Sequence, residues 1–514
     1  MTDQERLKKN ALCDWLVKEG IGDKSIEDAI TNAEILAILA VELRRKDCLA
    51  CVLEWYAALG QRSLSDEQAI FVDFGLASAI AGERYNTRWQ WEQPTLAREL
   101  YLLRRAISNP RFGGLPPHNR CMILNNLGNR LRVAGRYVEA LGCWDRTLEL
   151  EANFGMALFN RARTLAAYAG CLADAGKSAI FLFVAHQAVT SALAPTAVYT
   201  HIHDALSIEE ARKLKVWIES VADIPGIASN DPLAWPDDSG SEEERGYRRW
   251  CLTRRLFLDP ANDLGQYTIA AADSLWLPSH VVPVDSPHTF DGFFDQMKQE
   301  YVSARWMLYE GLNAKTPHFS DRGVPLYATE ARPALSLAVE KLKAAYRISY
   351  SLFDKISFFL NSYMCLGIPE KQVKFREIWR PGEKSPIRKE FDQTGNWGFC
   401  ALYWLAKDFF EKENDEVAEP GARSLSDIRN HLEHKYLRVT VGVPQARAPD
   451  ELAFVVSRKE FEAKALHLLA LARAALIYLA IGIGFEERRR APGRIEEQLQ
   501  ELSLPPFLAD AEKV

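Results

Sequence analysis

The sequence lacks an excess of positive charge. Its 69 Asp and Glu residues outnumber its 63 Lys and Arg residues, which gives a formal net charge of −6. A protein that coats nucleic acid through bulk electrostatic attraction needs a strongly basic surface. The composition therefore excludes that class of protein, although a local basic surface remains possible.

The sequence also has no long uninterrupted apolar run, and we expect no signal peptide. Residues 1–6 are rich in charge and begin no apolar segment of the kind that a signal peptide needs. The most apolar stretch, 466–483, is interrupted by Arg473, and its charge-free part is shorter than the ~20 residues needed to span a bilayer. We therefore expect a cytoplasmic protein without a membrane partner, in which this stretch is a buried core helix.

Cysteines are few and scattered, and their number, nine, is odd. In a cytosolic chain they are expected to be reduced and mostly buried. Cys48 and Cys51 form a C-x-x-C motif, but a zinc site would need two more ligands and none lies nearby. We interpret the pair as structural and expect no metal and no cofactor.

Alternation of the strand type is rare, whereas the 3.6-residue period of amphipathic helices dominates the chain. A hydrophobic content of 48% indicates a globular protein, and 514 residues are too many for one ordinary core. The sequence predicts an all-α fold, with N-terminal helical repeats followed by a C-terminal up-and-down helical bundle. The predicted segments are N-terminal helices at 1–65, repeats at 66–222, a linker or connector at 223–290, the bundle at 291–495 and a tail at 496–514.

The repeats are clearest between residues 121 and 153. Gly128 allows close contact on a first helix, and Ala140 and Trp144 follow on a second helix at tetratricopeptide spacing. A looser copy follows about 34 residues later. The region resembles a tetratricopeptide array, which implies a curved surface for a protein or peptide partner. A generic bundle of helical hairpins remains the alternative.

The most informative motif lies at 429–436. Arg429, Asn430 and His434 supply a permanent cation, an amide and a group that titrates near neutral pH, and Tyr436 follows two residues later. These groups are sufficient to cut RNA without a metal. On a helix spanning 425–437, however, Arg429 would lie about 140° from His434. One copy is therefore not expected to hold a phosphate between them, whereas two copies across a two-fold axis could.

Arg429, Asn430, His434 and Tyr436, late in an aromatic-rich helical bundle, resemble the motif of the HEPN superfamily. The stretches 353–356 and 402–408 supply the aromatic context. The resemblance is to the branch in which a HEPN domain follows tetratricopeptide-like repeats.

That resemblance implies a dimeric, metal-independent endoribonuclease that leaves a 2′,3′-cyclic phosphate. Arg429 would hold the scissile phosphate, His434 would transfer protons, and Asn430 would orient the phosphate or the imidazole. Tyr436 would be a site of modification by a partner. The resemblance further implies a toxin or defence effector that acts on RNA and is regulated by its repeats.

Each residue of the motif also has a structural interpretation. Glu433 is four residues from Arg429 and could form an exposed ion pair with it. His431 and His434, with Glu433 between them, have the spacing of two metal ligands, but no third ligand is identifiable. Two basic clusters could contact RNA or be solvated loop charge; they contain Lys371, Lys374, Arg376, Arg380, Lys384, Arg388 and Lys389, and Arg488, Arg489, Arg490 and Arg494. The competing function is a non-catalytic repeat scaffold whose bundle dimerises or binds nucleotide.

Overall fold

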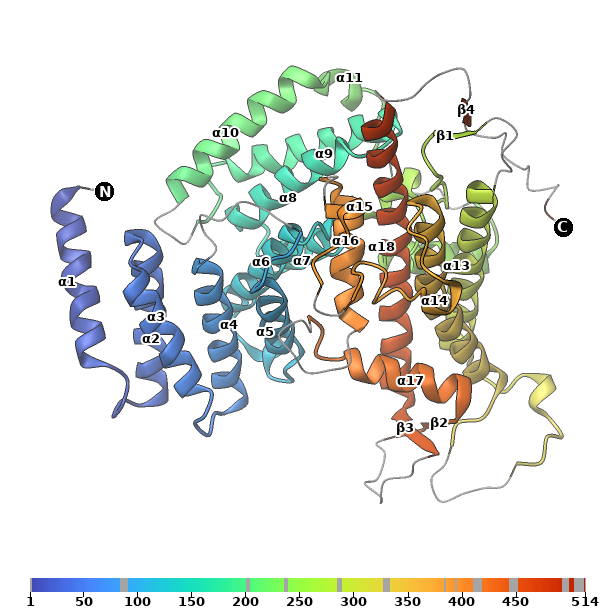
Figure 1. Cartoon of the computed structure of the whole chain (residues 1–514), viewed down its shortest axis with the longest axis horizontal. Helices are drawn as coiled ribbons and strands as arrows, with labels where there is room; N and C mark the ends of the chain where they lie inside the picture. Colours follow the sequence, from blue (N-terminus) through green and yellow to red (C-terminus); the bar gives the residue numbers. More distant parts are fainter. Residues whose placement is uncertain are drawn as a thin grey trace. The chain divides into compact units, whose positions relative to one another are not determined.

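The structure is a computed structural model, and it is all-α as predicted, with two short two-stranded sheets (Figure 1). It describes residues 2–83, 91–199, 204–234, 239–283, 289–326, 333–382, 385–392, 395–409, 418–442, 452–491, 499–502 and 513. The first of two compact units contains Met1–Thr164, Gln187–Val216 and Phe410–Ala422. The second unit contains Leu165–His186, Trp217–Phe409 and Arg423–Val514.

The first unit consists of consecutive helices. These are α1 (Asp3–Glu19), α2 (Ile26–Leu43), α3 (Lys46–Leu59), α4 (Asp66–Glu83), α5 (Leu96–Ser108), η1 (Phe112–Gly114), α6 (Pro117–Val133) and α7 (Tyr137–Leu150). The division between the units falls within the next three helices, α8 (Gly155–Ala169), α9 (Ala175–Ala192) and α10 (Asp204–Val221).

Neighbouring helices of the first unit pack as antiparallel hairpins, among them α4 with α5 and α6 with α7. The α6–α7 contact needs a glycine, because a Cβ atom on Gly128 would lie 2.7 Å from Nε1 of the buried Trp144. The predicted small-residue contact and the bulky side chain beside it therefore meet in the structure. All nine cysteines of the chain are free thiols, and the C-x-x-C pair lies within α3.

The second unit holds the longest helices. Its elements are α11 (Ile224–Ala228), α12 (Glu242–Thr253), η2 (Pro260–Asp263), η3 (Thr268–Ala270), β1 (His280–Pro283), α13 (Thr289–Asn313), η4 (Phe319–Asp321), α14 (Leu337–Tyr363), η5 (Glu370–Gln372), α15 (Lys389–Asp392), α16 (Trp397–Ala406), η6 (Lys407–Phe409), α17 (Ala422–His434), β2 (Tyr436–Thr440), β3 (Ala453–Ser457), α18 (Arg458–Arg490) and β4 (Leu499–Leu502). The strands pair as β1–β4, antiparallel, and β2–β3, parallel.

The core of the second unit is built around α18, which packs against α13, α14 and α16. At its crossing with α16 the two backbones touch, because a Cβ atom on Gly398 would lie 2.6 Å from the backbone nitrogen of Gly482. Asn396 caps the start of α16 and also donates its side-chain N–H to the carbonyl of Gly482 at 2.6 Å. Glycine on both helices therefore sets their closest approach.

Helix α18 is long and apolar enough to cross a membrane by length and composition, and 89% of its most apolar window is buried inside the structure. Arg473 lies in the middle of this helix and is 1% exposed. It donates to the carboxylate of Asp263 at 2.7 Å and to the carbonyls of Phe257 and Asp259 at 2.6 and 2.8 Å. Arg473 thus attaches η2 and the residues just before it to α18.

A matched pair of variants tests this attachment. Arg473→Met leaves the carboxylate of Asp263 buried without its cation, which costs about 3–5 kcal/mol and lowers the unfolding temperature of the second unit by roughly 6–20 °C. Lys459→Met removes an exposed cation from the same helix and should change that temperature by only about 1–2 °C. Differential scanning calorimetry measures both; equal effects would contradict the structural role of Arg473.

Candidate functional site

Helix α17 is held against α14 by an apolar stripe and by polar contacts at both of its ends. Leu425, Ile428 and Leu432, spaced at the helical period, are buried. Near the start of α17, the hydroxyl of Tyr346 donates to the carbonyl of Leu425 at 2.7 Å. At its end, Arg347 donates to the carbonyl of Leu432. Two adjacent residues of α14 therefore set the position of the helix that carries the predicted motif.

Glu433 pairs with Arg347, one of these two residues of α14. Its carboxylate lies 3.6 Å from the guanidinium of Arg347 in α14. The alternative interpretation, an ion pair with Arg429 within α17, is therefore not what the structure shows for Glu433. Its position makes Glu433 part of the attachment of α17.

Arg429 is half-buried and turned toward α14. Its guanidinium lies 5.6 Å from the ring centre of Tyr350 and donates to the side-chain oxygen of Asn430 at 3.1 Å. Burial raises the pKa of nearby Asp354, while the positive charges of Arg429 and then Arg376 act to lower it. Arg429 is thus held by the ring of Tyr350 and the amide of Asn430, and its charge acts on the carboxyl group of Asp354.

Sequence reasoning missed the α14 side of this site. Arg347, Tyr350 and Asp354 contact or face α17, and their spacing of three and four residues places them on one face of α14. A polar stripe on an otherwise aromatic helix was the available signal. The stretch 353–356 had been interpreted only as aromatic context.

His434 is the last residue of α17 and is exposed. In the part of the chain that the structure describes, it makes no hydrogen bond and no ion pair. His431, by contrast, bonds the carbonyl of Asp427 through Nδ1 at 2.7 Å. His434 is therefore the imidazole of α17 that is open to solvent and to a substrate.

The expected helix over 425–437 was wrong at its end. The helix stops at His434, and Tyr436 opens β2, which pairs in parallel with β3. Burial along Tyr436–Thr440 favours a strand because Leu437 and Val439 point inward while Tyr436 is 40% exposed. Arg438 lies over the ring of Tyr436, 5.3 Å from its centre.

The structure therefore brings Arg429 and Asn430 together but leaves His434 apart from them. Arg429 faces α14, whereas His434 faces solvent one and a half turns later. A guanidinium can neutralise a phosphate and an open imidazole can transfer a proton, so the two groups are chemically competent. Within one chain they do not form a single clamp.

Four arginines of the predicted basic clusters are bonded to groups of the second unit. Arg380 and Arg388 donate to Tyr403 and to the carbonyl of Ile378, and Arg489 and Arg490 both bond Glu486. Lys384 and Arg494 lie outside the described residues. Among the residues that the structure describes, no group of three His, Cys, Asp or Glu side chains is placed to hold a metal ion.

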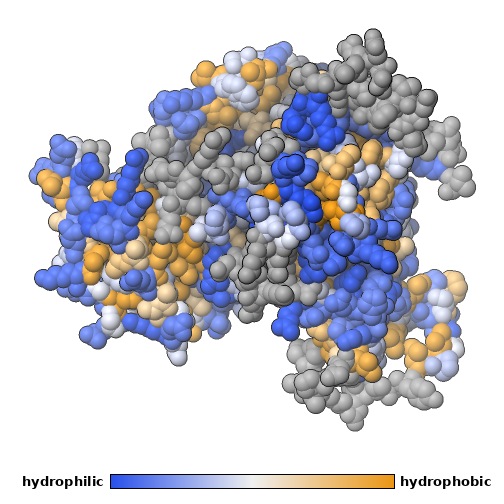
Figure 2. Space-filling view, in the orientation of Figure 1, coloured by the Kyte–Doolittle hydropathy of each residue, from blue (hydrophilic) through white to orange (hydrophobic). Residues whose placement is uncertain are grey.

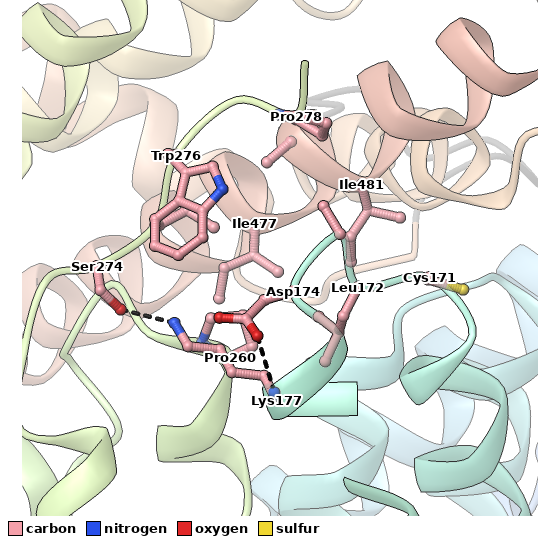
Figure 3. Close-up of a pocket in the computed structure, with 13 residues that line it drawn as sticks. Cys171, Leu172, Asp174, Lys177, Pro260, Ser274, Trp276, Pro278, Ile477 and Ile481 are labelled. Carbon is pink, nitrogen blue, oxygen red and sulfur yellow. Dashed lines mark hydrogen bonds between the residues drawn. The ribbon is translucent and has the colours of Figure 1, made fainter. Parts of the chain in front are cut away.

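A separate cavity of the second unit lies between Lys177, Trp276 and Ile477 (Figure 3). Its volume is about 50 Å³, far below the roughly 300 Å³ at which ligand sites begin. Lys177 is also engaged, since its ammonium bonds Asp259 at 2.9 Å and Ser274 at 2.7 Å. This cavity is therefore not a substrate site.

The attachment of α17 makes a local prediction. Arg347→Ala removes the donor to the carbonyl of Leu432, and a hydrogen bond from a charged group is worth about 1.5–3 kcal/mol. Amides in the last turn of α17 should exchange with solvent roughly 10–100-fold faster. Lys343→Ala, on the same helix but bonded to the exposed Glu340 one turn away, is the control. Hydrogen exchange read by mass spectrometry measures both, and unchanged exchange in Arg347→Ala would contradict the anchor.

Comparison with known proteins finds one family. Residues 282–486 match the family model described as LA2681-like HEPN. No curated protein and no solved structure matches the chain. The matched range contains α13, α14, α16, α17 and most of α18, so it includes both Arg429 and His434. HEPN domains are generally ribonuclease-like. The C-terminal region of this chain is a HEPN-superfamily domain.

Proposed function

We propose that this protein is a metal-independent endoribonuclease whose site is built from Arg429, Asn430 and His434. The observation that carries the proposal is that α17 holds a fixed cation and an exposed imidazole. Arg429 is fixed on α14 beside Tyr350, and His434 stands free at the helix end, within a HEPN domain. A pre-positioned cation and an accessible acid–base group are what a phosphodiester cleavage requires.

The proposed reaction is an internal displacement at phosphorus. The ribose 2′-oxygen forms a bond to the adjacent phosphorus while the bond from phosphorus to the 5′-oxygen breaks. The proton of the 2′-hydroxyl passes to the imidazole of His434 and from there to the leaving 5′-oxygen, while Arg429 neutralises the charge that grows on the phosphate. The products are a 2′,3′-cyclic phosphate and a 5′-hydroxyl, and Asn430 orients the guanidinium to which it is bonded.

The separation of Arg429 and His434 favours a homodimer in which each site uses both chains. An apolar surface next to α17 supports this arrangement. Tyr436, Val441, Leu452 and Val455 are 40%, 68%, 71% and 38% exposed. Figure 2 shows apolar atoms at the lower edge of the second unit, below the polar surface over α17. A second copy would cover side chains that water solvates poorly.

An RNA substrate is further supported by a hollow in the second unit. Its volume is about 700 Å³, within the range that holds a nucleotide, and its walls include His318, Phe319, Lys341 and Arg458. Phe319 is 72% exposed, and an exposed aromatic side chain can stack on a base. Arg458 directly follows β3, so the hollow lies at the opposite end of the β2–β3 pair from Tyr436.

Control by the repeats is supported by the segment that leads into α17. Residues 410–422 belong to the first unit, and there Arg104 of α5 donates to the carbonyl of Ala418 at 2.9 Å and lies 3.5 Å from Glu419. Helix α17 thus begins at the last residue of this segment and continues in the second unit. We propose a cytoplasmic toxin or defence effector whose tetratricopeptide-like repeats bind a protein or peptide partner, with Tyr436 accessible to modification.

Mixing two inactive variants tests the shared site. Arg429→Ala and His434→Ala should each lower RNA cleavage in EDTA at least 100-fold. If each site takes its arginine and histidine from different chains, refolding an equal mixture restores about 25% of wild-type activity, since half the dimers gain one intact site of two. A site contained in one chain restores none. Full activity of either variant alone would contradict the assignment.

A charge placed on the exposed apolar surface tests the dimer. Wild-type protein should have the mass of a dimer in light scattering, and Leu452→Glu should have the mass of a monomer and cleave RNA more slowly. An unpaired carboxylate in the interface would cost several kcal/mol. Leu326→Glu places the same charge at a side chain 56% exposed on a different segment and should leave mass and activity unchanged. A wild-type protein that is already monomeric and active would refute the dimeric site.

A further inference from the structure

Two arginines of the first unit lie on helices that a side-chain hydrogen bond joins. Arg132 lies in the last turn of α6, and Arg163 lies in the middle of α8. The two helices are in contact here, since Asn160 of α8 donates to the side-chain oxygen of Asn125 of α6 at 3.1 Å. Both arginines are only partly exposed, and the charge of Arg132 is close enough to lower the pKa of Arg163.

Other arginines of this region have a carboxylate partner. Contacts of 2.7–2.9 Å join Arg130 to Glu99, Arg136 to Glu139 and Arg161 to Asp145. Within the described part of the chain, Arg132 and Arg163 have no such partner. The Nε atom of each is buried and makes no hydrogen bond. A buried guanidinium without a counter-ion is costly, and two side by side are more so.

The electrostatics agree with this geometry. Burial lowers the pKa of Arg163 to about 9, and the charge of Arg132 lowers it further than any other neighbour does. Burial likewise lowers the pKa of Arg132. Both side chains are still cationic at neutral pH, so the fold holds two repelling charges in a site where water screens them poorly.

Local structural contacts offset only part of this cost. Arg132 lies at the C-terminal end of α6, where the helix dipole favours a cation, but Arg163 lies in mid-helix and gains nothing of that kind. Arg163 lies 5.3 Å from the ring centre of Phe159, which supplies one face of a cage. Tyr137 acts to raise the pKa of both arginines but is a neutral phenol at neutral pH, and Glu210, which acts less strongly on Arg163, is already 3.3 Å from Lys213. The pair therefore lacks the anion that would balance it.

We propose that Arg132 and Arg163 form a binding site for the phosphate group of a small soluble ligand. Two guanidiniums carry two positive charges, which match a phosphate monoester dianion better than a single carboxylate, and both can bond phosphate oxygens in pairs. Asn129 lies one turn before Arg132 on the same face of α6, and its side-chain oxygen is buried without a partner. Rotation of this amide would present its N–H groups to the same anion.

This site belongs to the first unit and is independent of the ribonuclease proposal. It assigns the repeats a chemical signal, a phosphate compound, in addition to any protein partner. Free phosphate and a nucleotide 5′-phosphate share the recognised group, and the experiment must separate them.

Thermal unfolding of the full chain tests the proposal. Potassium phosphate, compared with potassium chloride at equal ionic strength, should raise the unfolding temperature of the first unit by roughly 5 °C or more at 100 times its dissociation constant. Arg132→Gln and Arg163→Gln should abolish the rise. Arg146→Gln removes an exposed arginine of α7 and should keep it. In chloride alone, Arg163→Gln should unfold no earlier than wild type, because it removes one of two repelling charges.

Three further arms identify the ligand. Adenosine 5′-monophosphate acting more strongly than phosphate would indicate a nucleotide, and phosphate acting alone would indicate the free ion; adenosine should do nothing. Acetate that stabilises as well as phosphate would overturn the phosphate assignment. Calorimetric titration of wild type with phosphate does not depend on any variant folding. Absence of binding there, or a rise retained in both glutamine variants, would overturn the site altogether.

Discussion

The second unit depends on one charge placed where apolar side chains are expected. Arg473 lies in the middle of α18, the helix against which α13, α14 and α16 all pack. Its guanidinium satisfies the carboxylate of Asp263 and two backbone carbonyls. The pair adds little net stability over apolar packing, but either charge alone would be very costly to bury. It therefore fixes which segment covers α18, and so fixes the bundle on which α17 is carried.

The buried and half-buried arginines of this protein differ in how far their own chain balances their charge. Arg473 and Arg305 have their charge fully balanced, the latter by two bonds of 2.7 Å to Asp273. Arg429 is balanced in part, by an amide and an aromatic ring, which leaves donors for a phosphate. Arg132 and Arg163 have no carboxylate partner among the described residues. Burying a guanidinium without hydrogen-bond acceptors or a counter-ion from its own chain is costly, and a bound ligand would supply them.

Features that depend on residues close together in the chain could be predicted from the sequence, and features that depend on distant residues could not. The all-α fold, the stripe of Leu425, Ile428 and Leu432 and the close contact at Gly128 depend on local period and size, and all were predictable. The end of α17 was not, because Tyr436 becomes a strand only by pairing with Ala453. Arg347 and Asp354 were missed for the same reason: their partners are about 75–85 residues away in the chain.

The attachments at the two ends of α17 differ, which bears on the proposed control by the repeats. The end of α17 is held by Arg347 within the bundle, whereas the residues just before its start are held by Arg104 of α5 in the first unit. Helix α5 packs on α6, which carries Arg132. The two ends of α17 are therefore held by different parts of the chain, the start by a residue of the repeats and the end by a residue of the bundle.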